Sequence, residues 1–195
     1  MGRCTFTMDY NIKETEKKWQ SYWHTKKTYS FNPHSKKELF TIDTPPPTVS
    51  GAMHLGHAFS YAQGDFIARY KRMQQYEVFY PYGTDDNGLP TERLIESIHK
   101  IKAVKMDRNE FIKLCLKTLG EIKPKFVQSW RDIGISCDFE TSYSTIDPQC
   151  VATSQKSFID LYKKGRIYNE ETPMMWCTQC QTAIAQAELF CMHES

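Results

Sequence analysis

The sequence lacks several features that mark common protein classes. No apolar run approaches the roughly 20 residues of a membrane-spanning helix, so we expect no membrane partner. The first residues lack the apolar stretch of a secretory signal, and no repeat or low-complexity segment is present. Neither a Walker P-loop nor a Gly-x-Gly-x-x-Gly fingerprint occurs, so the usual NTPase and dinucleotide-binding classes lose support.

A charge excess and a regular set of cysteines are also missing. The 195 residues carry 25 Lys and Arg against 23 Asp and Glu, which disfavours a generic binder of DNA or another polyanion. The seven cysteines are an odd number with one close pair, whereas a disulfide framework would be denser and more regular. We therefore expect a cytoplasmic protein with reduced thiols, one candidate metal pair, and one domain with or without an appendage.

Apolar periodicity predicts a strand–helix–strand unit in the first half of the chain. Residues 38–43 are β-rich and end at three prolines, residues 54–73 have helical periodicity, and residues 77–80 are again β-rich. Such a unit builds a parallel sheet with a right-handed crossover. Before it, residues 10–27 predict a helix that packs onto the domain through an aromatic stripe of Trp19, Tyr22 and Trp23.

The second half of the chain predicts mostly helices. We expect a helix over 91–102, two helices broken near Pro124 over 108–135, and a helix over 148–164 between Asp147 and Gly165. Residues 138–145 and 166–176 are expected to be extended. Nine basic against three acidic residues between 99 and 131 predict a solvated face, and an RNA-facing surface is the alternative.

The most informative stretch, residues 45–57, lies between the end of the first strand and the start of the next helix. In an open parallel sheet, ligands bind beyond the carboxyl ends of the strands, and a helix N-terminus attracts phosphate. Gly51 and Gly56 let a nucleotide approach the backbone, and His54 and His57 are spaced to lie on one helix face. Two imidazoles there can stabilise charge that develops on a transferring phosphate.

Residues 54–57, His-Leu-Gly-His, resemble the HIGH motif of the class I aminoacyl-tRNA synthetases. Residues 44–51 resemble the valine, isoleucine and leucine group, valyl synthetases in particular, and residues 83–92 resemble their archaeal-type branch. Residues 176–188 add a third match in the right order. The resemblance implies an α/β fold: the first half of a Rossmann-like catalytic domain, with an N-terminal helix and the start of a zinc-knuckle insertion.

The resemblance also implies a reaction and an ATP site. Family members activate valine with ATP and Mg²⁺ to valyl-adenylate, release pyrophosphate, and pass the valyl group to tRNA(Val). The catalytic residues would be His54 and His57, which would stabilise the ATP phosphates. Gly56 would lie against the adenine ring, and Thr48 and Gly51 would belong to the same ATP site.

For the amino acid, the resemblance implies a pocket walled by Pro46 and Pro47, and an ammonium held by Asp85. A rigid apolar wall distinguishes one methylene group by only about 1–3 kcal/mol. An aspartate suits the ammonium, because a charge-assisted hydrogen bond fixes the orientation of the amino acid. The alternative for Asp85 is a turn-forming residue before Asn87 and Gly88.

Cys177 and Cys180 have the spacing of a zinc knuckle, which is half of a four-ligand site. Cys191 and His193 could complete such a site, although Cys-x-His is an unusual closing pair. The alternative is a turn with two free thiols.

The sequence lacks the second signature of the family, the Lys-rich KMSKS loop, and also the editing domain and anticodon-binding helices. We therefore expect an N-terminal fragment with a helical extension at 1–37, a partial catalytic domain at 38–165 and a truncated insertion at 166–195. Three alternatives remain: an isoleucyl or leucyl relative, a non-catalytic paralogue that binds tRNA or a protein through residues 99–131, and another nucleotidyltransferase of this fold. The oligomeric state is not predicted.

Overall fold

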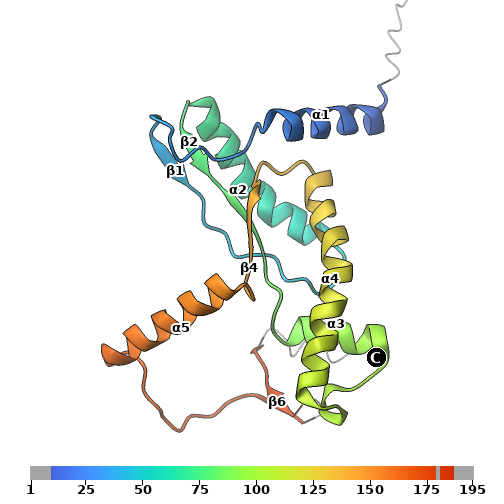
Figure 1. Cartoon of the computed structure of the whole chain (residues 1–195), viewed down its shortest axis with the longest axis vertical. Helices are drawn as coiled ribbons and strands as arrows, with labels where there is room; N and C mark the ends of the chain where they lie inside the picture. The colour runs from blue at the N-terminus through green and yellow to red at the C-terminus, as the bar shows by residue number, and fades with distance from the viewer. Residues whose placement is uncertain (1–9, 179–180, 187–195) are drawn as a thin grey trace, which may run out of the picture. The chain divides into compact units, whose positions relative to one another are not determined.

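The computed structural model describes residues 10–178 and 181–186, with mixed helices and strands (Figure 1). These residues fall into two compact units, one up to Val151 and one from Ala152 onward. The predicted domain boundaries at 37/38 and 165/166 stay predictions. In the described part of the chain, no helix combines the length and the apolarity that crossing a membrane requires.

The expected strand–helix–strand unit is present in the first unit. Strand β1 (Leu39–Thr41) pairs in parallel with β2 (Glu77–Phe79), and α2 (Leu55–Met73) connects them. The three prolines end β1, as expected, because proline cannot donate to the next rung of a sheet. The parallel pairing requires a crossover, and α2 supplies one that packs Ala68 into the core and Tyr61 against it, whereas most large apolar side chains of α2 are exposed.

One residue after β2, the chain enters β3 (Pro81–Thr84), which pairs in parallel with β4 (Asp138–Ser144). The register of this pair shifts between its first and second half, so β4 bulges. Gly83 is required there, because a Cβ atom at this position would overlap the ring of Tyr143. Beyond the bulge, the carboxyl ends of β3 and β4 lie side by side.

Helices α3 (Leu89–His99) and α4 (Arg108–Asp132) follow, with a 3₁₀ turn, η1 (Ala103–Lys105), between them. The prediction of two helices broken near Pro124 is wrong, because α4 continues through this proline. A proline inside a helix costs about 3 kcal/mol, and packing on both sides of it offsets this cost. The buried residues of α4 lie both before and after the proline: Phe111, Thr118, Leu119, Phe126 and Trp130.

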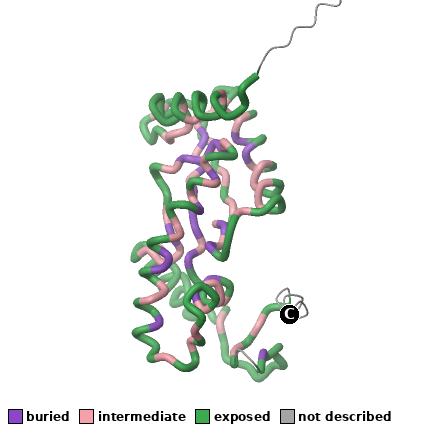
Figure 2. Tube along the Cα trace, turned by 90° about the vertical axis from the view of Figure 1, so that its right-hand side faces the viewer, coloured by how far each residue is buried: buried purple, intermediate pink, exposed green. Residues whose placement is uncertain are grey.

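The core of the first unit is formed by β2, β3 and the inner faces of α2, α3 and α4. Trp130 of α4 is fully buried at its centre, where the Tyr61 ring meets it edge-on at a centroid distance of 4.6 Å. Figure 2 shows the buried segments along the strands of this unit, whereas α1 is mostly exposed. The buried apolar members are Val49, Ala68, Val78, Tyr80, Tyr82, Ile95, Phe111, Leu119, Phe126, Trp130, Ile135 and Cys137.

A buried polar network fixes the C-terminal half of α2. The Asp65 carboxylate accepts hydrogen bonds from Arg69 Nε at 2.7 Å and from the Ser136 backbone N–H at 2.7 Å. Arg69 also donates to the Tyr29 hydroxyl at 3.0 Å, and Arg72 donates to the Ser136 carbonyl at 2.9 Å. The network ties α2 to the segment that enters β4.

Helix α1 (Ile12–Lys26) agrees with the expected helix, but only part of its aromatic stripe is packed. The Trp23 ring lies 5.5 Å from the Tyr29 ring and 5.6 Å from the Arg69 guanidinium carbon. Trp19 and Tyr22 are 45% and 49% exposed. The packing prediction is therefore confirmed for Trp23 alone.

Helix α5 (Pro148–Lys163) begins and ends where the sequence predicts. The carbonyl of Asp147 accepts its first backbone hydrogen bond at 3.0 Å, and Gly165 follows it with a left-handed φ of 65°. In the second unit, β5 (Trp176–Cys177) and β6 (Thr182–Ala183) form a short antiparallel pair.

Candidate functional site

The Pro-rich loop rejoins the sheet after β1. The Asp85 N–H donates to the Pro47 carbonyl at 2.9 Å, and the Val49 N–H donates to the Asp85 carbonyl at 2.9 Å. Thr48 and Asp85 thus form a parallel bridge. Pro47 and Val49 are buried, whereas Pro46 is half-buried and Ser50 is exposed. The loop is therefore held beside the carboxyl end of β3, the edge where parallel sheets bind ligands.

Tyr61 of α2 also supports this loop, and no motif in the sequence pointed to it. Its hydroxyl donates to the Pro45 carbonyl at 2.5 Å. Burial raises the pKa of Tyr61 to about 12, with Tyr143 and Cys137 adding to the effect. The hydroxyl therefore keeps its proton at neutral pH and stays a donor to the loop.

The two histidines of the motif lie together at the N-terminus of α2. His54 is the N-cap, and its Nδ1 accepts a hydrogen bond from the His57 backbone N–H at 3.3 Å. The two rings stack with centroids 3.8 Å apart and planes 16° apart. The expectation that they share one side of the helix holds, with His54 just before its first turn.

The contacts of the two rings determine the tautomer of His54 and lower the pKa of His57. Because Nδ1 of His54 is an acceptor, its neutral ring carries the proton on Nε2. Burial and the neighbouring His54 lower the pKa of His57, which is therefore neutral at pH 7. Within the described residues, the buried Nδ1 atom of His57 has no hydrogen-bond partner. The ring as a whole is half-buried, so part of it stays accessible to a ligand at this helix N-terminus.

The two glycines of the motif differ in their surroundings. A Cβ atom at Gly56 would lie 3.1 Å from the Cε1 and Nδ1 atoms of His54, so a side chain there would require this ring to shift by a few tenths of an ångström. A Cβ atom at Gly51 would meet nothing within 4 Å among the described residues. Gly56 therefore shapes the histidine pair, and Gly51 leaves open space above the backbone.

Asp85 lies half-buried between two threonine hydroxyls. Thr48 Oγ1 donates to its Oδ2 at 3.2 Å, and Thr145 Oγ1 donates to its Oδ1 at 3.1 Å. Among residues 10–178 and 181–186, no lysine or arginine forms an ion pair with Asp85. The carboxylate therefore keeps its charge available to a cationic ligand.

The adjacent Asp86, which the sequence did not single out, has the opposite environment. Its side chain is 1% exposed and its Oδ2 accepts from Lys123 Nζ at 2.6 Å and from Thr84 Oγ1 at 3.1 Å. The ion pair joins α4 to the end of β3. Only a pair of adjacent aspartates was visible in the sequence, and nothing there linked Asp86 to a lysine 37 positions away.

The remaining basic residues between 99 and 131 agree with the predicted solvated face. Apart from Lys123 and Arg131, all of them are exposed. The structure gives no test of an RNA partner for this face.

One of the four candidate zinc ligands, Cys177, lies among the described residues. Cys177 is buried in β5, whereas Cys180, Cys191 and His193 lie outside the described residues. In the part of the chain that is described, no group of three or more His, Cys, Asp or Glu side chains is placed to hold a metal ion.

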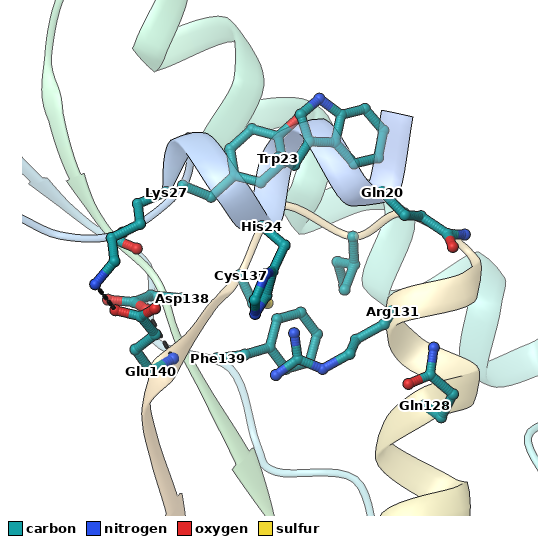
Figure 3. Close-up of a pocket in the computed structure, with 14 residues that line it drawn as sticks. Gln20, Trp23, His24, Lys27, Gln128, Arg131, Cys137, Asp138, Phe139 and Glu140 are labelled. Carbon is teal, nitrogen blue, oxygen red and sulfur yellow. Dashed lines mark hydrogen bonds and ion pairs between the residues drawn. The ribbon is translucent and has the colours of Figure 1, made fainter. Parts of the chain in front are cut away.

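A separate cavity of about 370 Å³ lies between α1, the end of α4 and the amino end of β4 (Figure 3). In it, the Arg131 guanidinium stacks 4.2 Å from the Phe139 ring centroid, and Lys27 Nζ pairs with Glu140 Oε2 at 3.1 Å. The described residues that line it include none of the predicted site residues. The cavity lies at the opposite end of β4 from Thr145 and does not belong to the candidate site.

Comparisons with known proteins found a matching family model and several relatives. A family model described as tRNA synthetases class I (I, L, M and V) matches residues 18–195. Valine–tRNA ligase of Rickettsia felis is 48% identical over 185 residues, which are 94% of this chain and 22% of that protein. The same enzyme of Thermoplasma acidophilum is 47% identical over 182 residues, 93% of this chain and 23% of the relative.

One solved structure is similar as well. It is the ternary complex of Agrobacterium radiobacter LeuRS with tRNA and LeuAMS, with a TM-score of 0.68 and 27% sequence identity. The match covers 92% of this chain and 21% of that chain. The chain thus spans about a fifth of the length of the relatives that it matches.

Proposed function

This chain belongs to the class I tRNA synthetases, and from that premise we propose that it contributes the ATP- and amino-acid-binding part of a valine–tRNA ligase. The observation that carries the choice of valine is the 48% identity to a valine–tRNA ligase across 94% of the chain. The proposed activity is activation of valine by ATP, followed by transfer of the valyl group to tRNA(Val).

In the first step, the carboxylate of valine attacks the α-phosphorus of ATP and pyrophosphate leaves. Charge develops on the phosphate oxygens, and donors that are already in place stabilise it. His54 and His57 suit this role because they lie stacked at the N-terminus of α2, where backbone N–H groups also favour anions. A neutral His57 acts as a hydrogen-bond donor, without a formal positive charge. Mg²⁺ would accompany ATP and neutralise part of its charge.

We assign the adenosine and the amino acid to neighbouring positions at the carboxyl end of β3. Thr48, Gly51 and Gly56 belong to the ATP site, where the open space at Gly51 supports close approach of the nucleotide. Asp85 is assigned to the ammonium of valine, which its uncompensated carboxylate would bind by charge-assisted hydrogen bonds.

The side-chain pocket is assigned to Pro46 and Pro47. The buried position of Pro47, whose carbonyl is bonded to the Asp85 N–H, supports a rigid wall next to the ammonium site. Such a wall excludes larger side chains by sterics and gives about 1–3 kcal/mol of discrimination per methylene group.

The test is calorimetric binding of a non-hydrolysable valyl-adenylate analogue, beside the leucyl and isoleucyl analogues. We expect the valyl analogue to bind most tightly and its affinity to fall at least about tenfold in His57→Ala, equivalent to about 1.4 kcal/mol. His34→Ala removes an exposed histidine outside the site and serves as the control. Tighter leucyl or isoleucyl binding would favour those relatives, and no binding by folded protein would refute the proposal for this chain.

We also propose that Cys177 and Cys180 form half of a zinc site in the insertion of this family. Their spacing and the burial of Cys177 support it. Metal analysis of the purified chain should find stoichiometric zinc that is lost in Cys177→Ser and kept in Cys150→Ser. Equal zinc content in both variants would contradict the assignment.

A further inference from the structure

We propose that Thr145 is a positioning residue that orients the Asp85 carboxylate for the ammonium of the amino acid. The inference rests on the proposed function and deepens it. Thr145 follows β4 directly and lies outside every motif by which the sequence resembles the family.

The direction of the Thr145 hydroxyl is set by its neighbours. The Asp86 backbone N–H donates to Thr145 Oγ1 at 3.0 Å, so this oxygen already accepts a hydrogen bond. Its single proton is then directed at Asp85 Oδ1, 3.1 Å away. The Thr145 hydroxyl therefore acts as a donor to Asp85, and the Asp85 carboxylate acts as its acceptor.

Thr145 itself is held rigidly. Its backbone N–H donates to the Thr84 carbonyl at 3.0 Å, which continues the pairing of β3 with β4. The following turn is closed twice: the Asp147 N–H donates to the Ser144 carbonyl at 3.0 Å, and the Ser144 N–H donates to Asp147 Oδ2 at 2.7 Å. The hydroxyl is therefore attached to a fixed part of the sheet.

Thr48, in the Pro-rich loop, contacts the other oxygen of the carboxylate: its Oγ1 donates to Asp85 Oδ2 at 3.2 Å. Each carboxylate oxygen thus receives one hydroxyl, from a different neighbouring segment. A carboxylate accepts about four hydrogen bonds, so half of its capacity stays open. An alkylammonium group, with three donors, can use the rest.

The nearby cation does not compete for this role. Lys123 is engaged with Asp86, whose side chain is 1% exposed. Asp85 is consequently oriented by two neutral hydroxyls and keeps its full charge. This arrangement fits a ligand that brings its own positive charge, as the ammonium of an amino acid does.

The test uses the 195-residue chain and two ligands that differ by one group: the valyl-adenylate analogue and its des-amino counterpart, which lacks the ammonium. In Thr145→Val, we expect the valyl analogue to bind about tenfold more weakly, the effect of losing one hydrogen bond to a charged group. Binding of the des-amino analogue should not change. Thr145→Ser keeps the hydroxyl and should restore valyl binding.

Thr141→Val is the matched control, because Thr141 is an exposed threonine of β4, the strand that Thr145 follows. Equal weakening of both ligands by Thr145→Val would mean a merely structural role and would overturn the inference, as would unchanged binding of both. If the unsubstituted chain binds the des-amino but not the valyl analogue, the inference is also wrong. Failure to bind either ligand refutes the proposed function, and with it this inference.

Discussion

The two ends of α2 hold their polar side chains in opposite conditions. In its C-terminal half, the carboxylate of Asp65 accepts from Arg69 and Ser136. At its N-terminus, the buried Nδ1 atom of His57 has no partner among the described residues. Leaving a buried polar atom unpaired costs about 1–3 kcal/mol. The saturated half therefore fixes the helix, whereas the open end retains hydrogen-bonding capacity for a ligand.

A second contrast, in charge pairing, separates the neighbouring residues Asp85 and Asp86, although the buried Oδ1 atom of Asp86 has no hydrogen-bond partner among the described residues. Asp86 is buried and paired with Lys123, while the half-buried Asp85 side chain has only the neutral hydroxyls of Thr48 and Thr145 as hydrogen-bond donors in the described part of the chain. The pair therefore separates a structural carboxylate from one that is free to bind a cation. The contribution of each group to the free energy of unfolding tests this division.

The largest effect on stability is expected at the saturated half of α2. Asp65→Ala leaves Arg69 without its buried carboxylate and removes both bonds to Ser136. We expect a loss of about 3–5 kcal/mol in the free energy of unfolding, measured by urea denaturation. Asp43→Ala, at an exposed position of the same unit, should stay within about 0.5 kcal/mol. Equal losses of stability in the two variants would show that the Asp65 network does not fix α2.

A smaller loss is expected when Asp86 is deprived of its cation. Lys123→Met keeps the aliphatic stem of the side chain but leaves a carboxylate buried without its ion pair. Loss of a hydrogen bond to a charged group should lower the free energy of unfolding by about 2 kcal/mol. Lys125→Met changes an exposed lysine of the same helix and is the control. If both variants unfold alike, Asp86 is not a structural carboxylate.

The smallest stability effect concerns pH and His57. Burial and His54 lower its pKa in the folded state, so the unfolded chain binds this proton first as the pH falls. The resulting stability is present above the unfolded pKa of about 6.5 and declines as the pH drops below it. The urea midpoint of the chain should therefore fall more steeply from pH 7 to pH 5.5 than that of His57→Gln. Parallel pH profiles would show that the ring is not held neutral.

Much of the fold could be predicted because its signals are local. The β-rich run, the prolines that end it and the helical periodicity after it predicted β1, α2 and β2 within a few residues. The helix break expected at Pro124 does not occur. The tendency of proline to break a helix is outweighed by the packing of Phe111 and Leu119 before it and of Trp130 after it. Similarly, Trp19 and Tyr22 follow the spacing of a buried stripe, yet among the described residues their rings contact only other residues of α1, whereas Trp23 also contacts Tyr29.

The candidate site was predictable only where residues lie in one motif. The stack of His54 on His57 follows from their spacing at a helix start. The contacts of Asp85 with Thr48 and Thr145 join residues 37 and 60 positions apart. Such pairs depend on which strands become neighbours, which one sequence does not reveal. The assignment of these residues to ATP and valine stays a prediction.

We propose that the open N-terminal end of α2 stabilises the phosphates during adenylate formation. The most direct test replaces the matched segment of the Rickettsia felis valine–tRNA ligase with this chain and measures valine-dependent exchange of pyrophosphate into ATP. We predict exchange by the hybrid that is lost in His57→Ala and kept in His34→Ala. A folded hybrid that exchanges pyrophosphate equally well without His57, or shows no exchange with valine, would contradict the account.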